Sequence, residues 1–337
     1  MIPLSKPSIT DLEKEYVYQA MSAGDIGVGP FIQKFEDAWA DWNDMTFGVS
    51  CNSGTNAIYL ALKALGIGPG DEVIVPEYTM VATAWAVTYT GATPVFVDCY
   101  DELIMDEIKA ERAITEKTKA IIVVPIYGRD ARYPVTNLPI IEDMAEAHGM
   151  KPQGDIACYS FYGNKILTTG EGGMCLTDNP KWAEEMRLYA NMYFDKGRTM
   201  IHPKVGHNFR MTNLQAAVGL AQVERVDEIL YKRERIQRWY DENLPEAYKM
   251  PRRDVLWMYD ISVEDNEKMK ALLEINGIPT RYGFKPMSQQ PMYFNEKYKD
   301  LNAYKWSKKI LYLPTYTDLT EEEVKKICKV IRSLDTN

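Results

Sequence analysis

The stretch YSFYGNKILTTGEGGMC, residues 159–175, contains the lysine around which the rest of the chain can be arranged. Lys165 lies between an aromatic pair, Phe161 and Tyr162, and the loop 170–173, whose three glycines allow a close approach to the backbone. Most lysines keep their ammonium in water, and a glycine-rich turn is usually only a turn. A partly desolvated lysine can instead lose its proton and form an imine with an aldehyde cofactor. Both interpretations stay open here, and the second predicts two further parts.

The first of these parts is a carboxylate, because pyridoxal phosphate needs one beside its ring nitrogen. The mostly apolar run 138–141 predicts a short buried strand that ends at Glu142 and Asp143. Ligands of open α/β sheets lie beyond the carboxyl ends of the strands, so Asp143 is the candidate. An acidic pair that merely ends the strand is the alternative.

The second part is a cradle for the phosphate, which the backbone N–H groups at a helix start can provide. Residues 51–56, CNSGTN, precede AIYLALKALG, whose apolar residues follow a helical spacing. Ser53 or Thr55 can cap this helix, and the N–H groups around Gly54 can bind an anion. An ordinary helix cap is the alternative.

With these three parts in the order anion cradle, carboxylate and lysine, the chain resembles the sugar-nucleotide aminotransferases of the DegT/DnrJ/EryC1/StrS family. The resemblance runs from IPLSKP at residues 2–7 to LPTYTDLTEEEVKKIC at residues 313–328. The lysine stretch, Glu146, the segment 205–222 and the tripeptide 257–259 look most like the subgroup that forms GDP-perosamine. The family implies the pyridoxal-phosphate type I (aspartate aminotransferase-like) fold, an α/β fold with a mainly parallel central sheet and a smaller C-terminal α/β domain.

The resemblance also implies roles for single residues. Lys165 would carry the imine and move protons. Pyridoxal 5′-phosphate, with pyridoxamine phosphate as its intermediate form, would be held by Gly54, Thr55, Met80, Asp143, Glu146, Ser160 and Asn208. The substrate would contact Gly27, Arg210, Arg281 and Ser288. Asn208 would reach the phosphate from the neighbouring subunit, which implies a homodimer with shared active sites.

Some positions depart from the family pattern. Met80 stands where relatives have an aromatic residue stacked on the cofactor, and Trp85 is expected either to compensate or to belong to the core. Near the substrate, Ser288 replaces a histidine and Tyr282 a proline. The segment 128–138 is shorter than in relatives, which place a helix there.

The reaction implied is the transfer of an amino group from L-glutamate to C4 of a nucleotide-linked 4-keto-6-deoxy sugar, with GDP-4-keto-6-deoxymannose as the acceptor. Two alternatives stay open: an aminotransferase for dTDP-4-keto-6-deoxyglucose, and a non-catalytic relative that only holds the cofactor. A sugar dehydratase of the same fold is disfavoured, because those relatives have histidine in place of the lysine.

Composition narrows the class of protein further. The 337 residues, 46% of them hydrophobic, suffice for two domains, which we place at 1–230 and 231–337. The formal charge of −9, without a sustained basic stripe, argues against nucleic-acid and anionic-membrane partners. Five widely spaced cysteines predict reduced, mostly buried thiols in a cytoplasmic protein, and the three histidines lack a metal-ligand spacing, so no metal is expected. No N-terminal stretch resembles a signal peptide.

Local signals predict the elements around the site. Short β-branched runs alternate with helical patterns between residues 46 and 230, which predicts a largely parallel sheet covered on both faces. Thr10 with Glu13, and Thr320 with Glu323, predict capping boxes at two helix starts. One long helix is expected after Asn213, through residues 214–244.

Overall fold

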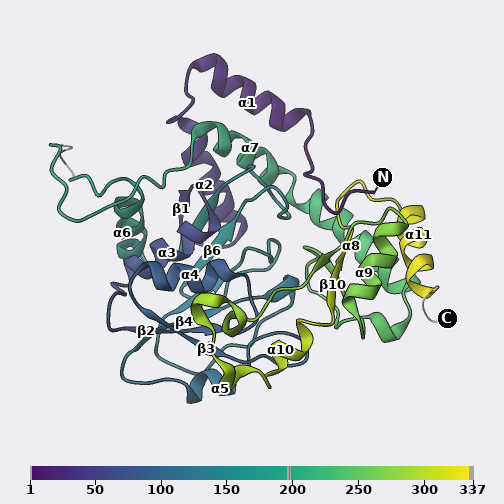
Figure 1. Cartoon of the computed structure of the whole chain (residues 1–337). Coiled ribbons are helices and arrows are strands. Elements are labelled where there is room, and N and C mark those ends of the chain that lie inside the picture. The colour runs from purple at the N-terminus through teal and green to yellow at the C-terminus, as the bar shows by residue number, and fades with distance from the viewer. Residues whose placement is uncertain (1, 196, 198, 334–337) are drawn as a thin grey trace.

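The computed structural model describes residues 2–195, 197 and 199–333, and at its centre is a seven-stranded sheet (Figure 1). The strands are β1 (Phe47–Cys51), β2 (Glu72–Pro76), β3 (Thr93–Val97), β4 (Thr118–Val123), β5 (Ile140–Asp143), β6 (Ile156–Ser160) and β7 (Gly173–Thr177). Their order in space is β1-β7-β6-β5-β4-β2-β3. The pairs from β3 through β6 are parallel, and β7 is antiparallel to both of its neighbours. The mainly parallel sheet expected from the sequence is confirmed.

Helices cover both faces of this sheet. They are α1 (Asp11–Ala23), α2 (Pro30–Trp42), α3 (Gly54–Ala64), α4 (Val81–Tyr89), α5 (Glu107–Arg112), α6 (Pro180–Ala190) and α7 (Asn213–Glu224). Successive residues of a strand point to opposite faces. On β6, Tyr159 packs edge-on against Trp39 of α2, whereas Ser160 lies against Gly54 at the start of α3. Helices α2 and α3 therefore cover opposite faces, and α7 packs outside α2 with α1 beyond it (Figure 1).

The long helix expected after Asn213 is two helices, which corrects the sequence prediction. Helix α7 ends at Glu224, and α8 (Val226–Asn243) begins after a single intervening residue, Arg225. The backbone at Arg225, with φ −114° and ψ 10°, leaves the helical path. Its guanidinium donates to Glu13 of α1 at 2.6 Å and to the carbonyl of Ser8, contacts that local helical periodicity does not reveal. The break lets α7 lie along α1 while α8 runs toward the C-terminal part of the chain (Figure 1).

The C-terminal part forms a second, smaller α/β unit. Its antiparallel sheet, in the order β8-β10-β9, consists of β8 (Tyr259–Ser262), β10 (Ile310–Leu313) and β9 (Arg281–Tyr282). Its helices are α8, α9 (Asn266–Ile275) and α11 (Glu321–Arg332), with the 3-10 turn η2 (Glu246–Tyr248). The helix α10 (Asn302–Trp306) and the 3-10 turns η3 (Met287–Gln289) and η4 (Pro291–Tyr293) come from the same part of the chain but pack on the large cluster, and η5 (Glu296–Tyr298) lies between η4 and α10 in the sequence. The 3-10 turn η1 (Ile126–Gly128) follows β4 in the large unit. Both predicted capping boxes, at Thr10 and at Thr320, are confirmed.

Two hydrophobic clusters correspond to these two units. Helix α8 connects them, since Ile229 belongs to the large cluster and Ile236 to the small one. The N-terminal arm crosses to the small unit, where Ile2 packs in the small cluster and the carbonyl of Leu4 accepts from the Thr315 N–H at 2.9 Å (Figure 1). We propose that the two domains divide near residue 230, within α8.

Several simpler expectations can be compared with the structure directly. All five cysteines are buried and unpaired. None of residues 129–139, all of which are described, lies in a helix or a strand. Within the described ranges, no helix combines the length and the apolar character needed to cross a membrane.

Candidate active site

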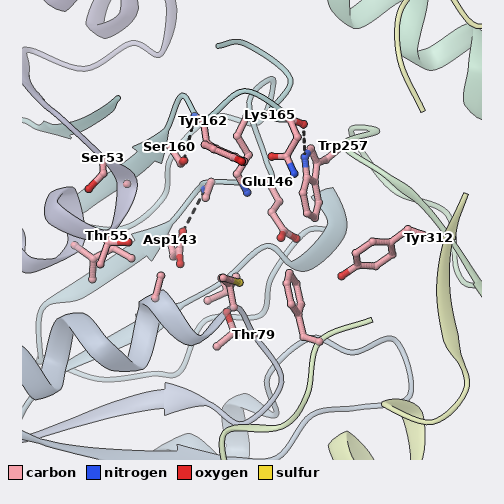
Figure 2. A pocket seen from close by; sticks show the side chains of 18 of the residues that line it. Ser53, Thr55, Thr79, Asp143, Glu146, Ser160, Tyr162, Lys165, Trp257 and Tyr312 are labelled. Carbon is pink, nitrogen blue, oxygen red and sulfur yellow. Dashed lines mark hydrogen bonds between the residues drawn. The ribbon is translucent and has the colours of Figure 1, made fainter. Parts of the chain in front are cut away.

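A cavity of about 450 Å³ lies beyond the carboxyl ends of β5 and β6, next to the start of α3 (Figure 2). This is the edge at which open α/β sheets bind ligands. Eight of the twelve residues that were assigned a catalytic, cofactor or substrate role from the sequence line this cavity: Gly54, Thr55, Met80, Asp143, Glu146, Ser160, Lys165 and Arg281. Segments separated by more than two hundred residues therefore meet around one space.

Lys165 lies in the loop between β6 and β7, where its N–H donates to the carbonyl of Tyr162 at 2.9 Å. This turn directs the side chain into the cavity (Figure 2). Burial lowers the pKa of the Lys165 amine, while the negative charges of Glu146 and Asp143 oppose that shift. A lysine in such surroundings can act as a free amine at a lower pH than a solvated one.

Asp143 is the last residue of β5, and its carboxylate is fixed from two sides. Thr83 of α4 donates its hydroxyl to Oδ2 at 2.7 Å, and the N–H of Ala145 donates to Oδ1 at 3.2 Å. The hydroxyl of Thr79, at 3.1 Å from that of Thr83, extends this chain of hydrogen bonds to the cavity wall. Burial raises the pKa of Asp143, and the hydrogen bond from Thr83 and the charge of Lys165 oppose this.

Glu146 is the second buried carboxyl group beside Lys165. The backbone N–H of Tyr127 donates to its Oε2 at 2.8 Å, and Tyr127 holds a left-handed conformation, with φ 55°, to do so. Burial raises the pKa of Glu146 to about 7, although the charge of Lys165 opposes this. Two acids and one amine thus line the same cavity.

The start of α3 forms the opposite end of the cavity. The side chain of Ser53 caps the helix by accepting from the Asn56 N–H at 3.2 Å. The N–H groups of the first helical residues, Gly54 and Thr55, have no intrahelical acceptor and can bind an anion. A Cβ at Gly54 would lie 2.6 Å from the Cβ of Ser160, so only glycine lets the turn and this serine approach each other.

This set of side chains fits pyridoxal phosphate. An amine, a buried carboxylate and an anion cradle with two hydroxyl groups lie around one cavity. These are the groups that the aldehyde, the ring nitrogen and the phosphate of this cofactor require.

The remaining walls of the cavity are mainly aromatic. Trp257, Phe284 and Tyr312 come from the C-terminal part of the chain and face the side chains of α3 and α4 across the cavity. Met80 lies at the N-terminal end of α4 and is 48% exposed, so its thioether borders the opening. Trp85 is partly buried and does not line the cavity.

Three predicted site residues lie away from this cavity in the single chain. Gly27 and Arg210 line a second cavity, of about 730 Å³, where Arg210 donates to the Asn191 side chain at 2.8 Å. Asn208 is exposed, although the carbonyl of the next residue, Phe209, accepts from the Asn52 N–H at 2.8 Å beside the Ser53 turn. Their proposed roles require a partner subunit and stay predictions.

Ser288 also lies outside the cavity lining. It is buried against Glu77, a contact that the sequence did not predict. Its N–H donates to Oε1 of Glu77 at 2.9 Å, and its hydroxyl donates to the same oxygen. Glu77 follows β2, so the contact joins the large unit to η3. In this chain Ser288 binds a buried carboxyl group, and its role toward the substrate stays a prediction.

The Glu77 contact predicts a pH-dependent stability. Burial raises the pKa of Glu77 to about 7, above its value in the unfolded chain, so folding favours the protonated carboxyl. The stabilisation is complete below pH 4.5 and is lost as the pH rises through 7. We expect the unfolding free energy of wild type, relative to Glu77→Gln, to fall by about 3 kcal/mol between pH 4.5 and pH 8. Urea unfolding at several pH values measures this difference.

The control for this experiment is Glu116→Gln, because Glu116 is exposed. This variant should follow the wild-type stability at every pH. A Glu77→Gln protein that also keeps the full pH dependence of the wild type would show that Glu77 is not the responsible group.

The structure also shows residues around the cavity to which the sequence analysis gave no role. Thr83 and Thr79 fix Asp143, and three buried tyrosines, 78, 127 and 312, join their hydroxyl groups at 2.7 to 2.8 Å next to the cavity. Trp257 stood out only through the resemblance of its tripeptide. Thr83 inside α4, Thr79 in the turn before it and the three isolated tyrosines carry no spacing signal, so these contacts could be found only in the folded chain.

Comparison with known proteins gives consistent similarities. The sequence model of the DegT/DnrJ/EryC1/StrS aminotransferase family matches residues 7–332. GDP-perosamine synthase of Caulobacter vibrioides is 41% identical over 364 residues, covering 99% of this chain and 97% of that protein. The GDP-perosamine synthase of Escherichia coli O157:H7 is 38% identical over 354 residues, covering 98% and 97%. The PLP form of Spr1654 from Streptococcus pneumoniae has a TM-score of 0.92 at 27% identity, covering 99% of this chain and 98% of that one. These similarities confirm the fold class expected from the sequence.

Proposed function

This chain belongs to the DegT/DnrJ/EryC1/StrS aminotransferase family, and we propose that it transfers an amino group from L-glutamate to C4 of GDP-4-keto-6-deoxymannose, which yields GDP-perosamine. It is a pyridoxal-phosphate-dependent sugar aminotransferase. The choice of GDP sugar is supported by the GDP-perosamine synthases, which match nearly the whole chain at up to 41% identity. The observation that best supports the chemistry is the convergence of Lys165, Asp143 and the turn 53–55 on one cavity.

The side chains around the cavity can be given roles toward the cofactor. When bound, pyridoxal phosphate supplies the aldehyde that takes up the amino group and the ring that withdraws electrons from the reacting carbon. Asp143 would hold the ring nitrogen in its protonated form, and its bond from Thr83 keeps the carboxylate in place. Gly54, Thr55 and Ser160 would hold the phosphate, Glu146 would meet the ring hydroxyl and Met80 would cover one face of the ring.

Lys165 would do the acid–base work. Once its amine is free, Nζ can take the proton from the α-carbon of glutamate and later return a proton to C4 of the sugar. The lowered pKa favours the free amine, and the surrounding protein keeps water from competing for the proton.

Basic side chains would meet the negative charges of the substrate. The chain as a whole carries a charge of −9, so a nucleotide diphosphate has to be bound by local cations. Arg281 is exposed on β9 at the cavity lining, and we assign it to the diphosphate or to the donor carboxylate. Arg210 and Gly27, at the second cavity, would reach the substrate of the partner's site.

We propose that the protein is a cytoplasmic homodimer that provides an amino sugar for glycan assembly, and that Asn208 of one subunit completes the phosphate site of the other. Asn208 is exposed next to the turn that carries the anion cradle. Removing a hydrogen bond to the charged phosphate should weaken cofactor binding about 10- to 100-fold in Asn208→Ala. Equilibrium dialysis with pyridoxal phosphate measures this loss.

Hybrid dimers test the sharing of sites. Lys165→Ala and Asn208→Ala subunits are unfolded together, refolded and assayed at a cofactor concentration that fills only native sites. If the two residues come from different subunits, half of the dimers contain one native site, and about a quarter of the wild-type activity returns. No gain over the separate variants would show that each site lies within one chain.

Product analysis tests the proposed reaction. The protein, pyridoxal phosphate and L-glutamate are incubated with the GDP- and dTDP-linked 4-keto-6-deoxy sugars, and the products are identified by mass spectrometry and NMR. We expect amination at C4 of the GDP-linked sugar. Preference for dTDP-4-keto-6-deoxyglucose would identify the protein as the dTDP-sugar aminotransferase named above as an alternative. A glutamate half-reaction without amination of either sugar would contradict the assigned acceptor.

A further inference from the structure

Trp257 lies directly against the proposed catalytic lysine. Its ring centroid is 4.3 Å from Nζ of Lys165, the distance of a cation–π contact. The indole N–H donates to the carbonyl of Asn164, the residue before Lys165, at 2.9 Å. The side chain is 4% exposed and reaches the cavity from the side opposite Ser53 and Thr55 (Figure 2).

The position of Trp257 is fixed by a buried arginine. Arg233 of α8 donates from Nη1 to the carbonyls of Leu256 and Trp257, at 3.2 and 2.9 Å. Within the described residues no carboxylate pairs with Arg233, and burial lowers its pKa to about 10. The ring of Trp257 also stacks on that of Tyr127, with centroids 6.3 Å apart and an angle of 17°. A buried cation without a partner charge therefore serves to hold the backbone of this tryptophan.

We infer that Trp257 is a positioning residue for Lys165, which holds the amino group in the cavity and stabilises its protonated form. The negative face of an indole ring attracts an ammonium group, and the attraction strengthens where water is excluded. The contact partly offsets the desolvation of the amine, so that Lys165 keeps a proton to return to the substrate. The functional meaning of this inference rests on the proposed role of Lys165, whereas the effect on the pKa does not.

Other titratable and charged groups near Lys165 also influence its pKa. The other titratable or charged groups that line the same cavity are Asp143, Glu146, Tyr162, Glu171, Arg281, Tyr282 and Tyr312. His148, behind the loop, accepts from the Leu167 N–H at 3.1 Å, and its pKa is lowered mainly by burial and further by the charges of Lys165 and Arg233. A substitution at Trp257 replaces none of these groups, so the wild type and the variants carry the same set of charges around Lys165.

The test measures the pKa of Lys165 in the cofactor-free, full-length protein. Trace acetylation with acetic anhydride over a pH series, read by peptide mass spectrometry against a free amine standard, gives the fraction of Lys165 that is deprotonated. In Trp257→Leu we expect the pKa of Lys165 to fall by about one unit, a tenfold change in free amine at a given pH. Trp257→Phe keeps a weaker ring and should shift it by about half as much.

Two controls separate this effect from a loss of structure. Trp306→Leu removes another tryptophan whose N–H also donates, to Asp101 at 3.1 Å, and should leave the Lys165 pKa unchanged. The folding of each variant is checked by circular dichroism. If Trp257→Leu does not fold, the Lys165 pKa in Trp257→Phe alone tests the inference. An unchanged or raised pKa would mean that the ring only excludes water, and would overturn the inference. Turnover is assayed in parallel, since active variants without a pKa shift contradict Trp257's role but not the proposed reaction.

Discussion

Lys165→Ala is expected to lower kcat of the overall amino transfer by about 10⁴-fold, the upper end of what a positioned acid–base group contributes. The same variant loses the only amine that lines the described cavity, so the cofactor can no longer be attached through an imine. Because the carboxylate and the anion cradle remain, we expect the variant still to bind the cofactor without a covalent bond. Stopped-flow absorbance during the glutamate half-reaction measures the rate directly.

The matched control is Lys181→Ala, which removes an exposed lysine on α6. It should react at the wild-type rate. Turnover of Lys165→Ala at the rate of this control would show that the proton is moved by another group.

Asp260→Asn is expected to cause the largest loss of stability, about 3 to 5 kcal/mol of unfolding free energy. Asp260 of β8 is fully buried between two arginines, which are themselves almost fully buried. Arg129 donates to it at 2.9 Å, and Nε of Arg253 donates at 2.7 Å. Loss of the one carboxylate leaves two guanidinium groups without a counter-charge in a place that water does not reach. Chemical denaturation monitored by circular dichroism measures the effect.

A surface pair provides the control for this prediction. Asp318 pairs with Lys6 at 2.7 Å, but both side chains are more than half exposed, so Asp318→Asn should change the stability by less than about 1 kcal/mol. An Asp260→Asn protein as stable as this control would mean that the two arginines find other partners. The result matters for the site, since Arg129 adjoins the turn whose Tyr127 holds Glu146.

Those parts of the site that depend on local backbone rules could be predicted from the sequence. Asp143 ends a short buried strand, and Gly54 and Thr55 begin a helix, so their positions at one edge of the sheet follow from the order of elements. Lys165 follows the next strand and reaches the same edge. Neighbouring parallel strands bring their carboxyl ends together, which is why residues far apart in sequence could be expected to meet.

Other parts of the site depend on long-range contacts that no spacing reveals. The break at Arg225 follows from its ion pair with Glu13, more than two hundred residues away. Ser288 lies at Glu77 because the C-terminal segment crosses back over the large unit. The contact of Trp257 with Lys165 likewise depends on how Arg233 fixes residues 256 and 257. Such long-range contacts depend on how distant segments of the chain pack against each other. The local sequence pattern carries no information about that packing.

Borohydride reduction of the protein with pyridoxal phosphate, followed by peptide mapping, tests the central assignment most directly. Reduction converts an imine between the cofactor and a lysine into a stable amine, which marks that lysine by mass. We predict a single phosphopyridoxyl group on the peptide that contains Lys165, and its absence when glutamate is added before the borohydride. A label on a different lysine, or an unlabelled Lys165 in protein that has bound the cofactor, would contradict the account.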